Sequence, residues 1–156
     1  MRMTNFCDLN IKRNYTSLGE DSIASSLVCP LLKVARFYDL SVGYFSSGVL
    51  STIFPGMIEF ARNNGQLRLI CSAHLSVNDV IAIEAGYIDR ESLIHKSFSE
   101  LFEEEVKEFD DLSLQLLYEL IVKGILDIKI AYTETSGDYH DKLGLLYDQD
   151  GNTIVF

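Results

Sequence analysis

Short apolar segments with strand character alternate along this chain with segments whose apolar residues recur at helical spacing, and this alternation constrains the fold most. The strand-like segments are 39–46, 66–72, 125–132, 142–147 and 153–156. Helical spacing occupies 21–38, 48–61, 76–85 and 89–124. Strands and helices that alternate in this way pack in layers, so we expect an α/β fold with a mixed β-sheet flanked by helices on both faces.

The first helical segment follows an irregular lead-in of residues 1–20, and the domain itself is expected to span 21–156. Asp21 is a candidate N-cap, because its side chain can accept hydrogen bonds from the first backbone N–H groups of a helix. Pro30 lies inside the apolar stripe that follows. Because proline lacks a backbone N–H, we expect a kink at this position or a helix that restarts there.

The helical region after the second strand has two expected interruptions. Ser76 and Asp79 resemble a capping box, which would begin a short helix that Gly86 ends. The segment 89–124 is long enough for two helices, with a break expected near Phe109. The region is therefore expected to contribute three helices.

Length and composition are those of an ordinary globular domain. The chain has 156 residues, 47% apolar and 23% charged, which is enough for one core without covalent staples. No apolar run is long enough to span a bilayer, and residues 1–13 lack the apolar region of a secretory signal. The three cysteines are widely spaced, so neither a disulfide framework nor a paired metal-binding motif is expected. We therefore expect a cytoplasmic protein.

The net charge of −10 argues against a nucleic-acid-binding surface, since phosphate backbones attract basic proteins. Much of the excess lies in one acidic run between Glu100 and Asp111, in which Lys107 is the one cation. A solvated helix face is the simpler interpretation of such a run. Sequence beyond the C-terminus, or a fused partner, would then have to supply a basic track for nucleic acid.

The pattern with the most chemical content lies near the C-terminus. His140 and Lys142 are two residues apart, so in an extended strand both side chains point to the same face. An imidazole nucleophile beside a fixed cation is suited to attack on a phosphate diester. The apolar run after Lys142 would bury the strand, and Asp148 to Gly151 would form a hairpin turn before the last strand.

The run Tyr-His-Asp-Lys-Leu-Gly-Leu-Leu-Tyr-Asp-Gln-Asp-Gly-Asn at 139–152 resembles the signature of the phospholipase D-like (HKD) superfamily, whose fold is an α-β-α sandwich. It is most similar to the branch of bacterial nucleases and helicase-linked defence proteins, and 40–48 looks like the first core strand of that branch. The specific residues are His140, Lys142 and Asp148. In the family this hairpin runs on into a Ser/Gly-rich turn and an asparagine, so we expect the domain to be truncated at its C-terminal end.

The resemblance implies a phosphodiesterase that cleaves nucleic acid, most simply DNA, through a phosphohistidine, without a metal or another cofactor. The family uses two copies of the motif and this chain has one, which implies a homodimer with a shared active site. His140 of one subunit would attack phosphorus, and His140 of the partner subunit would protonate the leaving oxygen. Lys142 would hold the phosphate oxygens. Asp148 would orient a histidine, although it also suits the hairpin turn by itself, and both roles stay open.

Weaker candidates for substrate binding follow the first core strand. Tyr44, Ser46 and Ser47 lie at the end of that strand where α/β sheets bind ligands, although they could simply end the strand and cap a helix. His74 has a similar place after the second strand, where a surface-loop histidine is the simpler interpretation. His95 lies in a helical segment without a partner nearby in sequence.

The function that the resemblance implies is that of a nuclease module in a restriction or helicase-linked defence protein. Its implied partners are nucleic acid and a fused or associated helicase. Two other functions compete with this one. A non-catalytic module that retains the fold and dimerises, or binds DNA or a partner protein, would fit the acidic charge and the incomplete pocket. A lipid-acting phosphatidyltransferase is disfavoured, because the sequence contains no membrane segment and no basic amphipathic helix.

Overall fold

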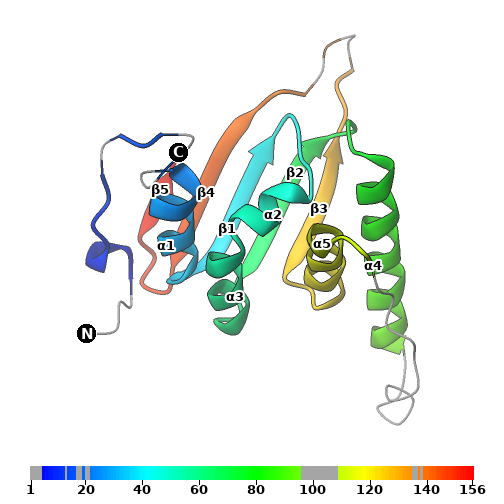
Figure 1. Cartoon of the computed structure of the whole chain (residues 1–156), viewed down its shortest axis with the longest axis horizontal. Helices are drawn as coiled ribbons and strands as arrows, with labels where there is room; N and C mark the ends of the chain where they lie inside the picture. The colour runs from blue at the N-terminus through cyan, green and yellow to red at the C-terminus, as the bar shows by residue number, and fades with distance from the viewer. Residues whose placement is uncertain are drawn as a thin grey trace.

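Five strands form one mixed β-sheet in the computed structural model (Figure 1). The structure describes residues 5–12, 14–16, 19, 22–95, 109–134, 137 and 139–156, and of residues 93–95 it describes the backbone. The strands are β1 (Ala35–Val42), β2 (Gln66–Ser72), β3 (Leu126–Ala131), β4 (Lys142–Asp148) and β5 (Thr153–Val155). Their order is β3-β2-β1-β4-β5; β1, β2 and β3 are parallel, and β4 is antiparallel to both neighbours. The predicted α/β fold with a mixed sheet is confirmed.

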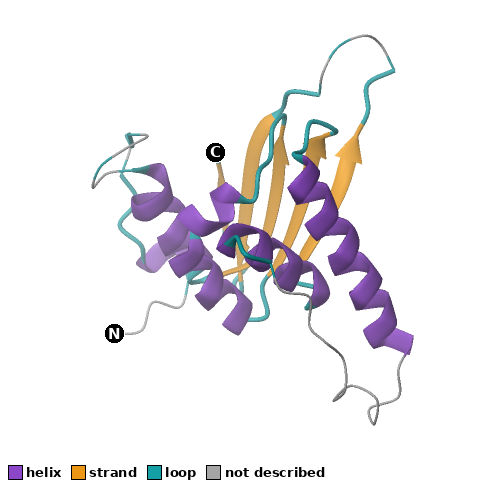
Figure 2. Cartoon of the chain, turned by 45° about the vertical axis from the view of Figure 1, so that its right-hand side comes forward, coloured by secondary structure: helices purple, strands orange, loops and turns teal. Residues whose placement is uncertain are grey.

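The described α-helices all lie on one face of this sheet (Figures 1 and 2). The helical elements are η1 (Phe6–Asp8), η2 (Ala24–Val28), α1 (Cys29–Leu32), α2 (Gly48–Thr52), α3 (Phe54–Arg62), α4 (Val77–His95) and α5 (Leu112–Val122). Helix α5 packs against α2 and α4, and α1 packs against α3. We expected helices on both faces of the sheet, whereas the described helices cover one face.

The strand order gives the physical reason for this one-sided arrangement. The connections from β1 to β2 and from β2 to β3 both step toward the same edge of the sheet. Parallel crossover connections are right-handed, so two steps in one direction put their helices on the same face. On the other side of β1, β4 enters antiparallel from a loop rather than from a helix. The periodicity of apolar residues does not show toward which edge of the sheet each connection steps.

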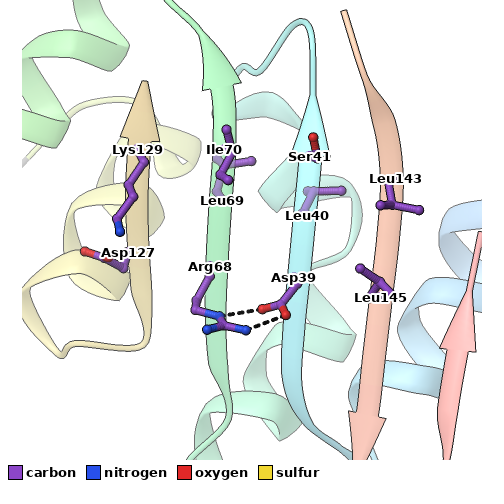
Figure 3. A pocket seen from close by; sticks show the side chains of 10 residues that line it. All are labelled: Asp39, Leu40, Ser41, Arg68, Leu69, Ile70, Asp127, Lys129, Leu143 and Leu145. Atoms are coloured by element: carbon purple, nitrogen blue, oxygen red, sulfur yellow. Dashed lines mark hydrogen bonds and ion pairs between the residues drawn. The ribbon is translucent and has the colours of Figure 1, made fainter. Parts of the chain in front are cut away.

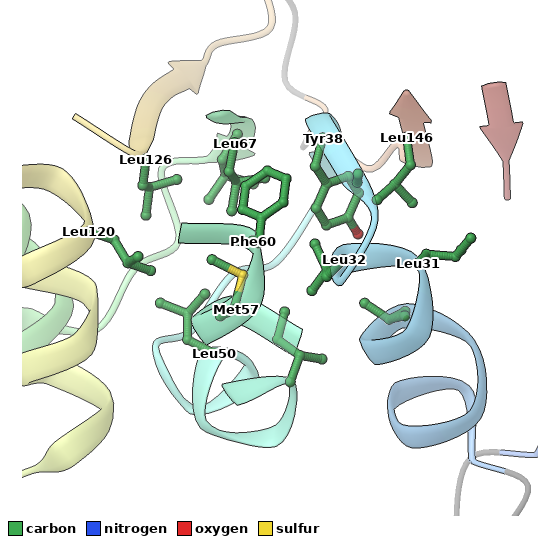
Figure 4. Close-up of a cluster of buried hydrophobic side chains, with 14 of the residues drawn as sticks. Leu31, Leu32, Tyr38, Leu50, Met57, Phe60, Leu67, Leu120, Leu126 and Leu146 are labelled. Atoms are coloured by element: carbon green, nitrogen blue, oxygen red, sulfur yellow. The ribbon is translucent and has the colours of Figure 1, made fainter. Parts of the chain in front are cut away.

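The core lies between the helices and the covered face of the sheet (Figure 4). The largest fully buried side chains come from both layers: Leu31, Leu32, Leu50, Met57, Phe60, Leu69, Leu117, Ile121, Leu126 and Leu146. Burial alternates along β4, where Leu146 is 0% exposed and Leu143, on the opposite face, is 41% exposed. The sheet is thus packed on one side, as sheets containing antiparallel strands commonly are.

The opposite, open face carries mixed polar and apolar side chains (Figure 3). Phe37, Ile70 and Leu143 are exposed on it. Across β1 and β2, the Arg68 Nε donates to Asp39 Oδ1 at 2.6 Å. Asp39, Arg68, Ile70 and Leu143 border a groove of about 330 Å³ that crosses β3, β2, β1 and β4.

The first strand begins four residues earlier than expected and ends at Val42 rather than Ser46. Ala35 and Tyr38 fit a helical stripe, yet both are buried strand residues that pair with β4. The restarted helix at Pro30 is confirmed, because the π-helical turn η2 gives way to α1 there, but α1 ends after one turn. Over so few residues helical and strand periodicity are not distinguishable, so pairing with a distant strand decides which structure the segment adopts.

Gly86 does not end a helix. Helix α4 continues through it to His95. A Cβ at Gly86 would lie 3.0 Å from the Cβ of Ile121 in α5. The glycine therefore permits close packing between two helices. The break near Phe109 is confirmed, since α5 begins at Leu112. The acidic run falls outside the described residues except for its last members, Asp110 and Asp111.

The expected helix over 48–61 is divided in two. Ile53 separates α2 from α3, and Pro55 lies in the first turn of α3. Proline is tolerated in a first turn because the N–H it lacks has no helical partner there. Among the helices that the structure describes, none is both long and apolar enough to cross a membrane.

Candidate functional site

Three ring side chains from distant segments meet at one end of the strands of the sheet. Tyr44 follows the carboxyl end of β1, His74 follows the carboxyl end of β2, and His140 precedes β4. Because β1 and β2 are parallel and β4 is antiparallel to β1, these three residues lie at the same end. This is the end where open α/β sheets usually bind ligands.

Tyr44 lies in contact with both histidines. Its ring centroid is 5.8 Å from that of His74, with the planes tilted by 43°, and 5.8 Å from that of His140, with the planes at 76°. Both distances are in the range of aromatic pairs, and the near-perpendicular geometry with His140 is a favourable one. Tyr44 is 63% exposed, and both imidazoles are exposed. We call these three residues the ring cluster.

Gly43 lets the backbone of His140 approach β1 closely. Its N–H donates to the Asp141 carbonyl oxygen at 2.9 Å, which extends the β1–β4 ladder by one step. A Cβ at this position would lie 2.8 Å from His140 Nδ1, closer than a side chain tolerates. The glycine thus permits His140 to lie close to the end of β1, where the Gly43–Asp141 hydrogen bond holds the segment.

Side chains alternate through this extension of the ladder. Tyr139 turns to β1, where its hydroxyl is hydrogen-bonded to that of Ser41, while His140 turns to Tyr44. Lys142 is the first residue of β4, exposed, and paired opposite Val42. Lying two residues apart in extended backbone, His140 and Lys142 point to the same face of the sheet. The arrangement can present an imidazole and an ammonium group to one ligand.

Asp148 lies at the other end of β4, away from the ring cluster. It is six residues beyond Lys142, which at about 3.3 Å per residue is a separation of about 20 Å. Its carboxylate accepts from the N–H groups of Phe6, Asp150 and Asn152 and from the Asn152 side-chain amide, at 2.8 to 2.9 Å. Within one chain it does not contact His140, and its contacts are those of the turn residue that the sequence also allowed.

The surroundings of Asp148 shift its pKa in two opposing directions. Burial, which leaves the residue 4% exposed, raises the pKa. Hydrogen bonds from Phe6, Asn152 and Asp150 stabilise the charged form and outweigh burial, so the pKa lies below its ordinary value of 3.8. The carboxylate is therefore a charged structural group that ties the hairpin turn to the N-terminal segment.

The serines after β1 differ in their positions. Ser46 is exposed near the ring cluster, whereas Ser47 is buried and its N–H donates to Asp79 Oδ1 at 3.1 Å. Asp79 is 2% exposed and also accepts from the Ser76 hydroxyl at 2.7 Å. The expected Ser76–Asp79 pairing is present, and the same carboxylate joins the β1–α2 loop to the start of α4. Of the predicted substrate-binding residues, Tyr44 and Ser46 are accessible and Ser47 is not.

His74 is an exposed loop histidine, as the simpler interpretation predicted, and the structure also brings it against Tyr44. Its N–H donates to the Ser72 hydroxyl at 3.3 Å, and its ring borders Tyr44. The available signal was its place after the second of two parallel strands, which becomes informative once β1 and β2 are known to be neighbours. The side chain of His95 lies outside the described part of the structure.

Among the described residues, no group of three histidine, cysteine or acidic side chains is arranged to hold a metal ion. Cys7, Cys29 and Cys71 carry free thiols, and burial raises the pKa of Cys71. In comparisons with known proteins, no family model, curated protein or solved structure matches this chain. The phospholipase D-like resemblance therefore stays a prediction.

Proposed function

We propose that this chain is a phospholipase D-like phosphodiesterase module that cleaves nucleic acid, most simply DNA, with His140 as the nucleophile. The proposal is supported above all by the position of His140, an exposed imidazole against Gly43 and Tyr44 at the end of the sheet where α/β folds usually bind ligands. Exposed Lys142 on the same face supplies a positive charge for a phosphate. We keep a cytoplasmic location and a fused or associated helicase as parts of the same proposal.

The reaction has two displacements at phosphorus. A neutral His140 nitrogen attacks, a phosphorus–nitrogen bond forms, and the phosphorus–oxygen bond to the leaving group breaks. A protonated imidazole, His140 of the partner subunit in a homodimer, gives its proton to the leaving oxygen. The same imidazole then removes a proton from water, whose oxygen attacks phosphorus and returns the electron pair to His140. No metal is required for either displacement.

Lys142 stabilises the charge on the non-bridging phosphate oxygens during both displacements. An ammonium group held by a strand needs little reorganisation as the transition state forms, which is the main source of electrostatic catalysis. The partner subunit's Lys142 would act in the same way across the two-fold axis. Asp148 is left out of the chemistry, because its oxygens are occupied by the hairpin turn and Phe6.

A non-catalytic module that binds DNA or dimerises is the second candidate. The net charge of −10 and the open face of the sheet, where Phe37, Ile70 and Leu143 are exposed, favour a protein partner or a second copy of the chain over DNA for such a module. It predicts that dimers or complexes persist in His140→Gln, which sedimentation of the variant would reveal.

Nicking of supercoiled plasmid in excess EDTA tests the proposal. Wild type should nick the plasmid, and His140→Gln and Lys142→Ala should lose at least about 10²-fold in rate. Lys129→Ala, which removes an exposed cation from the open face, is the matched control and should nick as wild type does. Equal nicking by His140→Gln would contradict the proposal. A folded wild-type chain that does not nick would favour the non-catalytic module.

A further inference from the structure

We propose that Tyr44, bordered by His74, is a stacking site for one nucleobase of a single-stranded nucleic acid, placed beside the phosphate at His140. This inference rests on the proposed function and specifies its substrate. A base bound at Tyr44 and a phosphate bound by His140 and Lys142 would be neighbouring parts of one strand. The site would thus recognise the base and the phosphate, which every nucleotide presents.

The exposure of the ring cluster is the first observation behind the proposal. Tyr44 is 63% exposed although it has two ring neighbours, and His74 is exposed as well. The core is formed elsewhere, between the helices and the covered face of the sheet. The fold therefore does not need these rings together, and a large part of the Tyr44 ring stays accessible to a ligand.

The loop that carries Tyr44 is held on both sides, which prepares the ring for binding. Before it, the Gly43 N–H is bonded to the Asp141 carbonyl oxygen. After it, Phe45 is buried, and the Ser47 N–H is bonded to the buried carboxylate of Asp79. A ring on a fixed loop loses little conformational freedom when a ligand binds, so more of the stacking energy contributes to affinity.

The charge of the chain favours a single strand over a duplex. A net charge of −10 gives little general attraction for a phosphate backbone, so binding has to come from contacts other than charge. Stacking on aromatic side chains is such a contact, and it accepts any base. In a duplex the base faces are covered by their neighbours, whereas a single strand offers them. Tyr44 can therefore bind single strands or unpaired ends.

Binding of short oligonucleotides tests the inference. The probes are an eight-residue oligothymidylate, the same strand with abasic residues, and a duplex of equal length. All are measured by fluorescence anisotropy in His140→Gln so that they stay intact. We expect the oligothymidylate to bind tightest. Its affinity should fall about 5- to 150-fold in Tyr44→Ala, the factor that corresponds to stacking of one base.

Control variants separate stacking from other effects. Tyr44→Phe should keep the affinity, and Tyr44→Leu should lose most of it, because leucine is apolar but has no π face. Phe54→Ala, which removes another exposed aromatic ring at the start of α3, should bind as the parent does. The abasic strand should bind equally weakly to the parent and to Tyr44→Ala. The salt dependence should be shallow, about −0.7 in log affinity per log salt for each phosphate contacted.

Two results would overturn the inference: equal binding of the normal and abasic strands by the parent, or unchanged affinity in a folded Tyr44→Ala variant. Equal loss for both strands in Tyr44→Ala would also contradict it, because the variant would then have disturbed phosphate binding. Cleavage of the oligothymidylate by wild type is measured in parallel. Cleavage without Tyr44-dependent binding would leave the proposed function and remove this inference. Tyr44-dependent binding without cleavage would contradict the proposed nuclease function and leave the stacking site.

Discussion

Gly43 and His140 are in such close contact that a side chain at position 43 would strike the histidine backbone. A Cβ on Gly43 would lie 2.9 Å from the Cα of His140 and 3.0 Å from the carbonyl oxygen of Tyr139. Backbone atoms cannot move aside as the end of a flexible side chain can. The position of the proposed nucleophile is therefore permitted by the absence of a side chain on the neighbouring segment.

The Gly43→Ala variant should reduce nicking without unfolding the protein. The methyl group pushes His140 away from β1, and a displacement of about 1 Å in a reacting group costs about 10²-fold in rate. Plasmid nicking and thermal melting should be measured on the same sample. Gly48→Ala is the matched control, because its Cβ would meet only the Ser46 Oγ at 3.7 Å, an ordinary contact. Equal activity of the two variants would contradict the role assigned to Gly43.

Replacing Asp148 should destabilise the fold rather than alter the chemistry. Asp148→Ala leaves the buried N–H of Phe6 and the partly buried N–H of Asn152 without an acceptor, so the free energy of unfolding should fall by about 2–4 kcal/mol. Urea unfolding measures this loss. Asp150→Ala, which removes an exposed carboxylate of the same turn, should cost less than about 1 kcal/mol. A stable Asp148→Ala variant without nicking activity would instead support the orienting role that the resemblance implies.

Asp148 should also make stability depend on pH in the acid range. Its pKa is lower in the folded chain than in the unfolded chain, so the charged carboxylate contributes stability that is fully present above the ordinary value of 3.8. This contribution is lost as pH falls from that value through the lower, folded pKa. Urea unfolding between pH 6 and about pH 3 should therefore be steeper in pH for wild type than for Asp148→Asn. Parallel curves would show that this carboxylate is not stabilised by folding.

One-sided packing of the sheet predicts unequal effects of two leucines on β4. Leu146→Ala empties a fully buried position and should lower the free energy of unfolding by about 2–5 kcal/mol. Leu143→Ala, on the open face, should lower it by less than about 1 kcal/mol, since that residue is 41% exposed. Urea unfolding of the two variants provides the comparison. Similar losses would mean that something covers the open face in solution.

The sequence predicts those features that depend on local pattern. β2 has the predicted bounds, Gln66–Ser72, because turn residues flank an alternating apolar segment on both sides. β1 begins early because of its pairing with β4, more than a hundred residues away. Helix α4 passes Gly86, against which α5 packs closely. These outcomes depend on contacts between distant segments, which no local pattern contains.

The candidate site, too, could be predicted only where it depends on local pattern. The alternation that puts His140 and Lys142 on one face is a property of extended backbone and could be predicted. The contact of His74 with Tyr44 depends on β1 and β2 being neighbours, and the role of Asp148 depends on Phe6 reaching the hairpin turn. The motif spacing alone could not distinguish a turn residue from an orienting one.

Trapping of the covalent intermediate tests the central claim most directly. The chain is mixed with a phosphorus-32-labelled oligonucleotide in EDTA, quenched in base, and analysed for label attached to protein. The account predicts a base-stable, acid-labile phosphohistidine in wild type, which peptide mass spectrometry assigns to His140 and which His140→Gln lacks. Label on another residue, or nicking by wild type with no labelled protein at any quench time, would contradict the account.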